Sequence, residues 1–179
     1  MVGSVFKTDE RPQRRVGRFD FDWFPPPVTI ANMWLLLVLL AVSPEEPQVV
    51  ATVQKLFDAM AAHDGVAASA ITIPEGRVFV VRPTGEPGAS STLAQFAERL
   101  PTIKGKILER MWKPEVRVDG RMATLWAPYD FYRDGQRTHC GIDAVDLVKT
   151  ASGWKISGIS YTVITEGCPT SPLGAPPAE

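Results

Sequence analysis

Two acids and a histidine lie close together in the C-terminal half of this 179-residue chain: Asp130, His139 and Asp143. A carboxylate beside an imidazole can hold one tautomer of the ring and raise its pKa, as a general base or acid requires. We therefore take these three as candidate catalytic residues, with His139 as base or acid, Asp130 orienting it, and Asp143 or a tyrosine as a hydrogen-bond partner. The chemistry they suggest is cofactor-free isomerisation, dehydration or cyclisation.

The turn between Asp130 and His139 decides which side chains of the two flanking strands meet. Asp134-Gly135 is a strong signal for a two-residue hairpin turn, which would pair Arg133 with Gln136. The same register places Asp130 opposite His139, with paired side chains on one side of the sheet. One face is then predicted to carry Trp126, Asp130, Tyr132, Arg137, His139 and Asp143, and the other Leu125, Tyr129, Phe131, Cys140, Ile142 and Ala144.

A second arrangement of this hairpin stays open. Pro128 and Gly141 lie opposite each other in the predicted register, and both are residue types found at β-bulges. One bulge would move every residue beyond it to the other face. Without a bulge, the more apolar face would pack on the helices and leave His139 on the outer face or in a dimer contact.

Four aromatic residues are candidates for ligand binding. Tyr129 and Tyr161 could direct hydroxyl groups into a cavity, while Trp126 and Tyr132 share the predicted face of His139. A buried core or interface aromatic is the alternative for each. One histidine with scattered acids gives no ligand spacing, so no metal site is predicted, and no phosphate-binding loop indicates a cofactor.

The two cysteines could form a disulfide. Cys140 lies within a predicted strand, and Cys168 could approach it if the chain turns back at Glu166 and Gly167. Two free thiols are the alternative. Cys140 follows His139 directly, but neighbouring residues on a strand point to opposite faces, so this pair is not predicted to act as a nucleophile and its base.

The elements that would position these residues are helices first and then an antiparallel sheet. Apolar residues at helical spacing predict helices over residues 47–64 and 91–100, with a hairpin-like pair of short strands around residues 74–76 between them. Period-two alternation predicts four strands over residues 107–118, 121–133, 136–149 and 154–164. The sequence therefore predicts an α+β domain with helices on one face of a curved sheet.

Residues 47–165 resemble the nuclear transport factor 2-like superfamily, which includes ketosteroid isomerase, scytalone dehydratase and polyketide cyclases. The stretch "APYDFYRDGQRTHCGIDAVDLVKTASGWKISGISYT" is similar to a bacterial lumazine-binding-like subgroup with Tyr-x-Phe-Tyr, His-Cys-Gly and Gly-Trp-Lys-Ile patterns. The resemblance implies a cone-shaped fold of N-terminal helices on a curved, mainly antiparallel sheet, a deep pocket between them, and frequent homodimers. Catalytic residues do not carry over, because neither His63 nor His139 aligns with the roles known in these enzymes.

We divide the chain into a disordered N-terminal segment (1–46), the folded domain (47–168) and a flexible tail (169–179). The apolar run at residues 34–42 falls short of the roughly 20 residues that cross a bilayer. It resembles the central region of a secretory signal at about residues 33–43, which would place the protein in the periplasm or outside the cell. The alternatives are a cytoplasmic protein and an apolar helix that docks on the domain.

Composition limits the partners. A formal net charge of -1, with 22% charged residues, offers no basic field of the kind that nucleic acid requires. The expected partners are a small organic ligand and a second copy of the chain, with no nucleic acid and no stable membrane span. The sequence thus predicts a small-molecule-binding protein whose catalytic activity stays undecided, the alternative being a non-catalytic exported module for ligand binding or protein interaction.

Overall fold

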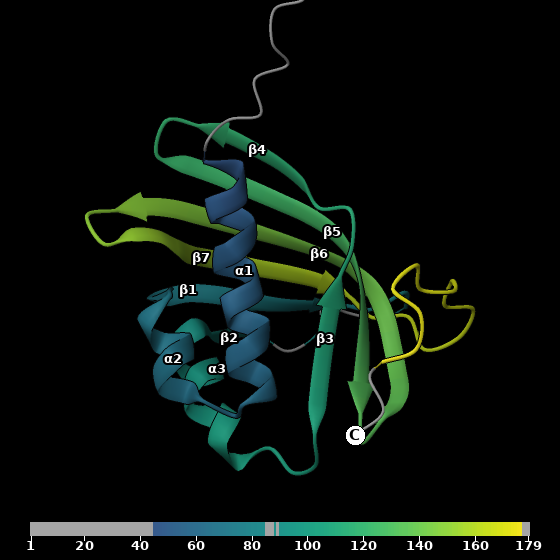
Figure 1. Cartoon of the computed structure of the whole chain (residues 1–179). Helices are drawn as coiled ribbons and strands as arrows, with labels where there is room; N and C mark the ends of the chain where they lie inside the picture. The colour runs from purple at the N-terminus through teal and green to yellow at the C-terminus, as the bar shows by residue number, and fades with distance from the viewer. Residues whose placement is uncertain (1–44, 85–87, 89, 177–179) are drawn as a thin grey trace, which may run out of the picture. The chain divides into compact units, whose positions relative to one another are not determined.

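The computed structural model describes residues 45–84, 88 and 90–176. The basic N-terminal cluster and the apolar run that suggests a signal lie outside these residues. No helix within the described part of the chain is long and apolar enough to cross a membrane. In chain order the elements (Figure 1) are α1 (Glu46–Ala61), α2 (Gly65–Ala70), β1 (Thr72–Val81), β2 (Ser90–Thr92), α3 (Leu93–Arg99), the 3₁₀ helix η2 (Leu100–Thr102), β3 (Ile107–Met111), β4 (Glu115–Asp119), β5 (Met122–Arg133), β6 (Gln136–Thr150) and β7 (Gly153–Thr162).

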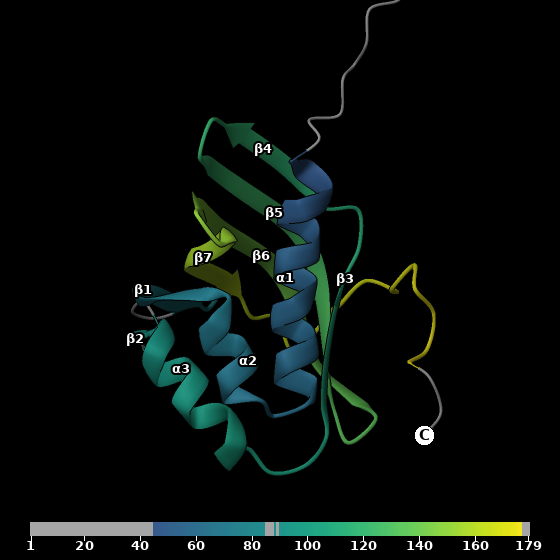
Figure 2. The ribbon, with the colours of Figure 1, turned by 60° about the vertical axis from the view of Figure 1, so that its left-hand side comes forward.

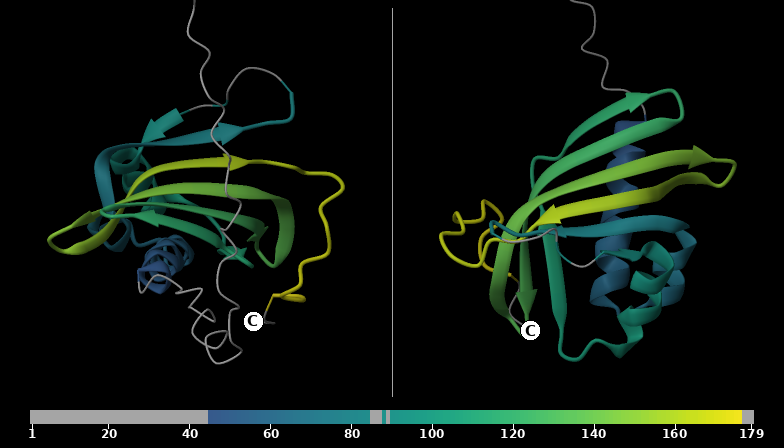
Figure 3. Two further views of the ribbon diagram at one scale, coloured as in Figure 1. Left: turned by 90° about the horizontal axis from the view of Figure 1, so that it is seen from above. Right: turned by 180° about the vertical axis from the view of Figure 1, so that it is seen from behind.

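The strands form one curved sheet in the order β2-β1-β7-β6-β5-β3, with β4 also paired to β5. Every pairing is antiparallel except that of β1 with β7. The helices cover one face of this sheet, which we call the inner face (Figure 2). In the view from behind, the sheet lies in front of the helices and shows its outer face (Figure 3). The predicted α+β architecture of helices on a curved, mainly antiparallel sheet is confirmed.

Two predicted strand arrangements were wrong in detail. The predicted strand over residues 107–118 is divided into β3 and β4, because Lys113 has a positive φ of 46° and Pro114 has no backbone N–H to donate. The predicted hairpin at residues 74–76 is an irregularity inside β1, where the pairing with β7 shifts between Thr72 and Arg77. The predicted hairpin is therefore one strand, β1, and the predicted single strand is two, β3 and β4.

Helix α1 packs on the inner face through a stripe at helical spacing that includes Val49, Val53 and Leu56. The helix ends before His63, which has a positive φ of 55°. Asp64 then caps α2 by accepting a hydrogen bond from the backbone N–H of Ala67 at 2.9 Å. At the other end, the Glu45 carboxylate accepts hydrogen bonds from Lys149 and Trp154 and thereby holds the start of α1 against the sheet.

The hairpin between β5 and β6 contains a bulge at Thr138. Arg133 pairs with Gln136 as predicted, but one extra residue follows in β6, so that Phe131 pairs with His139 and Asp130 pairs with Cys140. The predicted pairing of Asp130 with His139 is therefore wrong. Beyond the bulge every β6 side chain lies on the face opposite to the predicted one, which brings His139 and Asp143 to the inner face and moves Cys140, Ile142 and Ala144 to the outer face.

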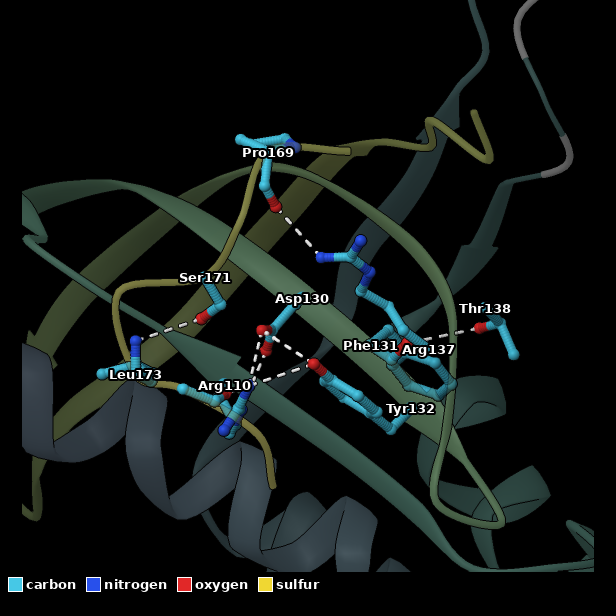
Figure 4. A network of polar contacts seen from close by, with 10 residues as sticks. Arg110, Asp130, Phe131, Tyr132, Arg137, Thr138, Pro169, Ser171 and Leu173 are labelled. Atoms are coloured by element: carbon cyan, nitrogen blue, oxygen red, sulfur yellow. Dashed lines mark hydrogen bonds and ion pairs between the residues drawn. The ribbon is translucent and has the colours of Figure 1, made fainter. Parts of the chain in front are cut away.

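The C-terminal tail follows the outer face of the sheet and is held there by one disulfide and two hydrogen bonds. Cys168 forms a disulfide with Cys140, with a Cα–Cα distance of 5.9 Å. Arg137 donates a hydrogen bond to the carbonyl of Pro169 (Figure 4), and Arg110 donates one to the carbonyl of Gly174. We predicted residues 169–179 as a flexible tail and did not foresee these contacts, which reach as far as Gly174.

The tail explains why burial stops alternating along β5. Up to Tyr129 the buried residues are those of the inner face, but Asp130 and Tyr132 on the outer face are also buried. Asp130 accepts two hydrogen bonds from Arg110, at 2.9 and 2.7 Å, and the Tyr132 hydroxyl lies 3.4 Å from the same carboxylate (Figure 4). These three side chains form a buried polar cluster beneath the tail.

Candidate functional site

A cavity of about 270 Å³ lies between the helices and the inner face of the sheet. Helix α1 and the α3–η2 segment supply apolar walls, and the sheet supplies the polar groups. The apolar part includes Leu56, Phe57, Met60, Phe96, Leu100 and Ile103, and the polar part is Glu109, Tyr129, Arg133, His139, Asp143 and Tyr161. The arrangement suits a small organic ligand with few polar atoms.

The carboxyl groups of Glu109 and Asp143 form a pair on the cavity wall. Burial raises the pKa of Glu109 well above its usual range, and the charge of Asp143 and a shared hydrogen bond raise it further. Burial raises the pKa of Asp143 to about 7, opposed by the hydrogen bond to Glu109. The Oδ2 atom of Asp143 is buried and has no partner within the described residues. One proton is therefore shared near neutral pH, and one oxygen is free to meet a ligand.

The sheet brings this pair together from strands that are not neighbours. Glu109 on β3 pairs with Phe131, and Asp143 on β6 pairs with Ala127, so that β5 lies between the two acids. The small side chain of Ala127 leaves room over β5. Tyr129 lies between these two levels of β5, and both acids raise its pKa, after the larger effect of burial.

Tyr129 is fixed by a contact that only glycine at position 141 permits. Its hydroxyl donates a hydrogen bond to the carbonyl of Thr162 at 2.7 Å. A Cβ atom on Gly141 would lie 2.1 Å from that carbonyl oxygen, which is backbone and cannot move aside cheaply. Because Gly141 has no side chain, Thr162 can approach β6 and accept the hydroxyl of Tyr129. Tyr129 thus serves as a fixed wall of the cavity.

His139 lies on the cavity wall as a neutral ring. It stacks on Phe131 with ring centroids 4.8 Å apart and meets Tyr129 edge to face at 5.8 Å. Burial lowers its pKa, with a further contribution from the charge of Arg82. The hydroxyl of Thr138, the bulge residue, lies 2.9 Å from Nδ1. His139 can therefore exchange hydrogen bonds with a ligand at pH 7 but carries little charge.

Tyr161 completes the polar wall from β7. Its ring meets that of Tyr129 edge to face, with centroids 6.3 Å apart, and burial is the main cause of its raised pKa. The Tyr161 hydroxyl therefore stays protonated and can donate to a ligand.

The structure brings together four of the seven candidate catalytic and ligand-binding residues: His139, Asp143, Tyr129 and Tyr161. The other three do not line the cavity, since Asp130 and Tyr132 lie beneath the tail and Trp126 is 53% exposed on the outer face. Their side chains cannot contact a ligand bound in this cavity. In the part of the chain that the structure describes, no group of three or more His, Cys, Asp or Glu side chains could hold a metal ion.

Glu109 was not among the site residues predicted from the sequence. Its signal was present in "ILERM", where the alternation places Glu109 on the same side of the strand as Ile107 and Met111. An acid among inward-facing apolar residues is costly unless it is paired, so such a position marks a candidate site.

Comparison with solved structures places this architecture among known folds. An NTF2-like protein with a cystatin-like fold from Novosphingobium aromaticivorans superposes with a TM-score of 0.57 at 13% identity, covering 77% of this chain and 88% of that one. The chain has the nuclear transport factor 2-like fold. No family model matches the sequence, and no curated protein matches it.

Two further structures with the nuclear transport factor 2-like fold show the same relationship. A candidate dehydratase of the NTF2-like family from Streptomyces avermitilis gives a TM-score of 0.54 at 17% identity, covering 66% of this chain and 94% of that one. A superfamily member from Salmonella enterica gives 0.55 at 16% identity, covering 68% and 92%. At these identities the likeness shows the fold alone, and the lumazine-binding-like subgroup stays a prediction.

Proposed function

We propose that the chain binds a small organic molecule in the cavity and transfers protons to and from it with the Glu109–Asp143 pair, without a cofactor. The observation that carries this proposal is the buried Asp143 carboxyl, whose pKa is raised to about 7 and whose Oδ2 has no partner among the described residues. A raised carboxyl pKa near neutral pH in an apolar pocket is what acid/base catalysis needs.

The pairing assigns different protonation states to the two acids. Two carboxylates in close contact cannot both ionise readily, so the pair holds one proton over a wide pH range. Burial and the charge of Asp143 raise the pKa of Glu109 well above its usual range, so we assign the shared proton to Glu109 and the role of base to Asp143. A proton acceptor and a proton donor then lie side by side on one wall.

A ketone can react at this pair with every atom accounted for. Asp143 removes a proton from the carbon next to the carbonyl, and the C–H electron pair forms the carbon–carbon double bond of an enol. The carbonyl oxygen takes the proton of Glu109 and can accept a hydrogen bond from Tyr161. In a β,γ-unsaturated ketone, Asp143 returns its proton to the γ carbon while the enol O–H returns its proton to Glu109, which gives the conjugated isomer. In a β-hydroxy ketone, the enol O–H returns its proton to Glu109 as the carbonyl re-forms, and the departing hydroxyl takes the proton from Asp143 and leaves as water. Both acids end in the protonation states in which they began.

The cavity limits the size and polarity of the substrate. Its volume of about 270 Å³ lies just below the range of about 300–1,000 Å³ that is usual for ligand pockets. Its apolar walls disfavour sugars and nucleotides, whose many polar atoms would lose their hydration there. Dehydration agrees with the description of the Streptomyces avermitilis protein, which shares the fold.

The proposal can be tested by hydrogen–deuterium exchange at carbon. Cyclohexanone is incubated with the protein in D₂O, and loss of the protons next to its carbonyl is followed by ¹H NMR. We expect Asp143→Asn to lower the exchange rate by about 100-fold or more, the usual effect of losing a general base. Asp146→Asn is the matched control, because Asp146 lies on the same strand but is exposed. Equal rates for wild type and Asp143→Asn would contradict the proposal.

A non-catalytic exported module is a second candidate, favoured by the disulfide and the outer face. Disulfides persist in oxidising compartments, and Cys140–Cys168 is of this kind if the predicted signal is used. Met122 and Trp126 are 58% and 53% exposed on the outer face, as expected for contact with a second copy. Ligand binding without any exchange activity, together with a dimer in sedimentation, would favour this function.

A further inference from the structure

The charged residues of the cavity wall are separated by sign. Glu109 and Asp143 are the acids, and Arg133 is the one fully cationic residue among the described lining residues. Arg133 pairs with Ile107, two residues before Glu109 on β3. At about 3.4 Å per strand residue, the level of Arg133 lies about 7 Å along the sheet from that of Glu109. The cavity thus has an acidic pair inside and a cation at one end.

Arg133 lies where the cavity meets solvent. It is exposed, whereas Tyr129, on the same face of β5 four residues earlier, is 1% exposed. Its guanidinium makes one long hydrogen bond, 3.5 Å, to the carbonyl of Lys104. Within the described residues no carboxylate lies within ion-pair distance of it; the neighbouring Asp134 instead accepts the backbone N–H of Lys106 at 2.8 Å. The guanidinium can therefore receive an anion.

Apart from Arg133 and Glu109, the wall at these two levels carries almost no charge. Phe131 lies at the level of Glu109, one step inward from Arg133 on the same face, and stacks on the ring of His139. Ile107 faces Arg133 across the strand pair. A ligand that spans the two levels therefore contacts an apolar side chain beside each charged group.

We propose that the ligand is a small oxo monocarboxylate, with its carboxylate on Arg133 and its ketone at the Glu109–Asp143 pair. This inference rests on the proposed function for the position of the ketone. A carboxylate placed beside the acid pair would be repelled by it, whereas at Arg133 it gains a two-point, charge-assisted contact. Arg133 is then the residue that determines specificity for an acid over its neutral analogues.

The test compares acids with their methyl esters, which have the same body without the charge. The probes are 4-oxopentanoate, 5-oxohexanoate and 6-oxoheptanoate, each with its ester, and binding is measured by calorimetry. We expect the wild type to bind at least one acid about tenfold or more tightly than its ester. Arg133→Gln should reduce this preference to about twofold or less, since the amide cannot form the ion pair.

Two further arginines separate this site from general charge effects. Arg117→Gln removes a charge from an exposed position on β4 and should leave the preference unchanged. Arg82 lies close enough to His139 to lower its pKa but does not line the cavity, so Arg82→Gln should also retain most of the preference. Equal binding of acids and esters by the wild type, a failure of every acid to bind, or an undiminished preference in Arg133→Gln would overturn the inference.

Failure of this inference is distinguishable from failure of the proposed function. If the ester exchanges its protons as fast as the acid and Asp143→Asn abolishes both, the acid/base function stands and the role of Arg133 falls. If the acid binds through Arg133 but Asp143→Asn leaves its proton exchange unchanged, the binding site stands and the catalytic function falls.

Discussion

Glu109 and Asp143 lie on strands that do not pair with each other, yet both carboxyl groups line one cavity wall and each affects the pKa of the other. The arrangement depends on the bulge that brings Asp143 to the inner face and places the small Ala127 opposite it. Burial of two such acids lowers the stability of the fold. Destabilising groups of this kind at the polar end of an otherwise apolar cavity indicate a functional site.

The pair predicts a falling stability with rising pH. The pKa of Asp143 is raised from 3.8 to about 7, so between these values the folded protein holds a proton that the unfolded chain has lost. The free energy of unfolding therefore decreases as pH rises through this window. Asp143→Asn cannot ionise and should flatten the slope, whereas exposed Asp146→Asn should not. Urea denaturation at pH 5 and pH 8 measures the difference, and an unchanged slope in Asp143→Asn would contradict the raised pKa.

The same pair predicts the pH dependence of proton exchange. Because Asp143 acts as a carboxylate, the rate should rise with pH to a midpoint near its pKa of about 7, and fall again when Glu109 loses its proton. Burial lowers the pKa of His139 below its ordinary value of 6.5, so the ring loses its proton at a lower pH than Asp143 does. His139→Gln should therefore keep the rising limb even if the rate decreases. Loss of that limb in His139→Gln would assign it to the histidine instead.

Asp130 has a structural role in this account. It is completely buried and bound by Arg110 in two hydrogen bonds on the outer face. Asp130→Asn leaves the charge of Arg110 without its partner and should lower the free energy of unfolding by about 3 kcal/mol. Ligand affinity in the cavity should stay within about twofold, since no contact is lost there. A large loss of affinity with unchanged stability would show that Asp130 belongs to the site.

The disulfide should stabilise the domain by restricting the unfolded chain. Cys140 and Cys168 are 28 residues apart, and closing a loop of this length is worth about 3–4 kcal/mol in the chain-entropy account. The double variant Cys140→Ser/Cys168→Ser should lose this stability, as should the wild type in reducing agent. The double variant and the reduced wild type are each compared with the oxidised wild type by thermal unfolding. A wild type that does not respond to reducing agent would contradict a bridged pair.

The regular part of the fold could be predicted because it depends on local patterns. Period-two alternation and the Asp-Gly turns identify β5, β6 and β7, and the apolar stripe identifies α1. These signals involve residues that are close in sequence. They therefore hold whatever the rest of the chain does.

The site could be predicted only in part, because it depends on single residues and distant contacts. The bulge at Thr138 has no compositional signal of its own, yet it decides whether His139 faces Asp130 or Phe131. The partner of Asp130 is Arg110, twenty residues away on another strand. Glu109 and Asp143 meet diagonally across β5, a contact that no spacing in the sequence encodes.

The titration of Asp143 is the measurement that tests this account most directly. The side-chain carboxyl carbon is followed by ¹³C NMR from pH 3 to 9, and its signal is assigned by its loss in Asp143→Asn. The paired, buried acid should titrate with a midpoint at about 7 and show a second step as Glu109 loses its proton. A single midpoint near the ordinary value of 3.8 would contradict the shared proton, and with it the acid/base function.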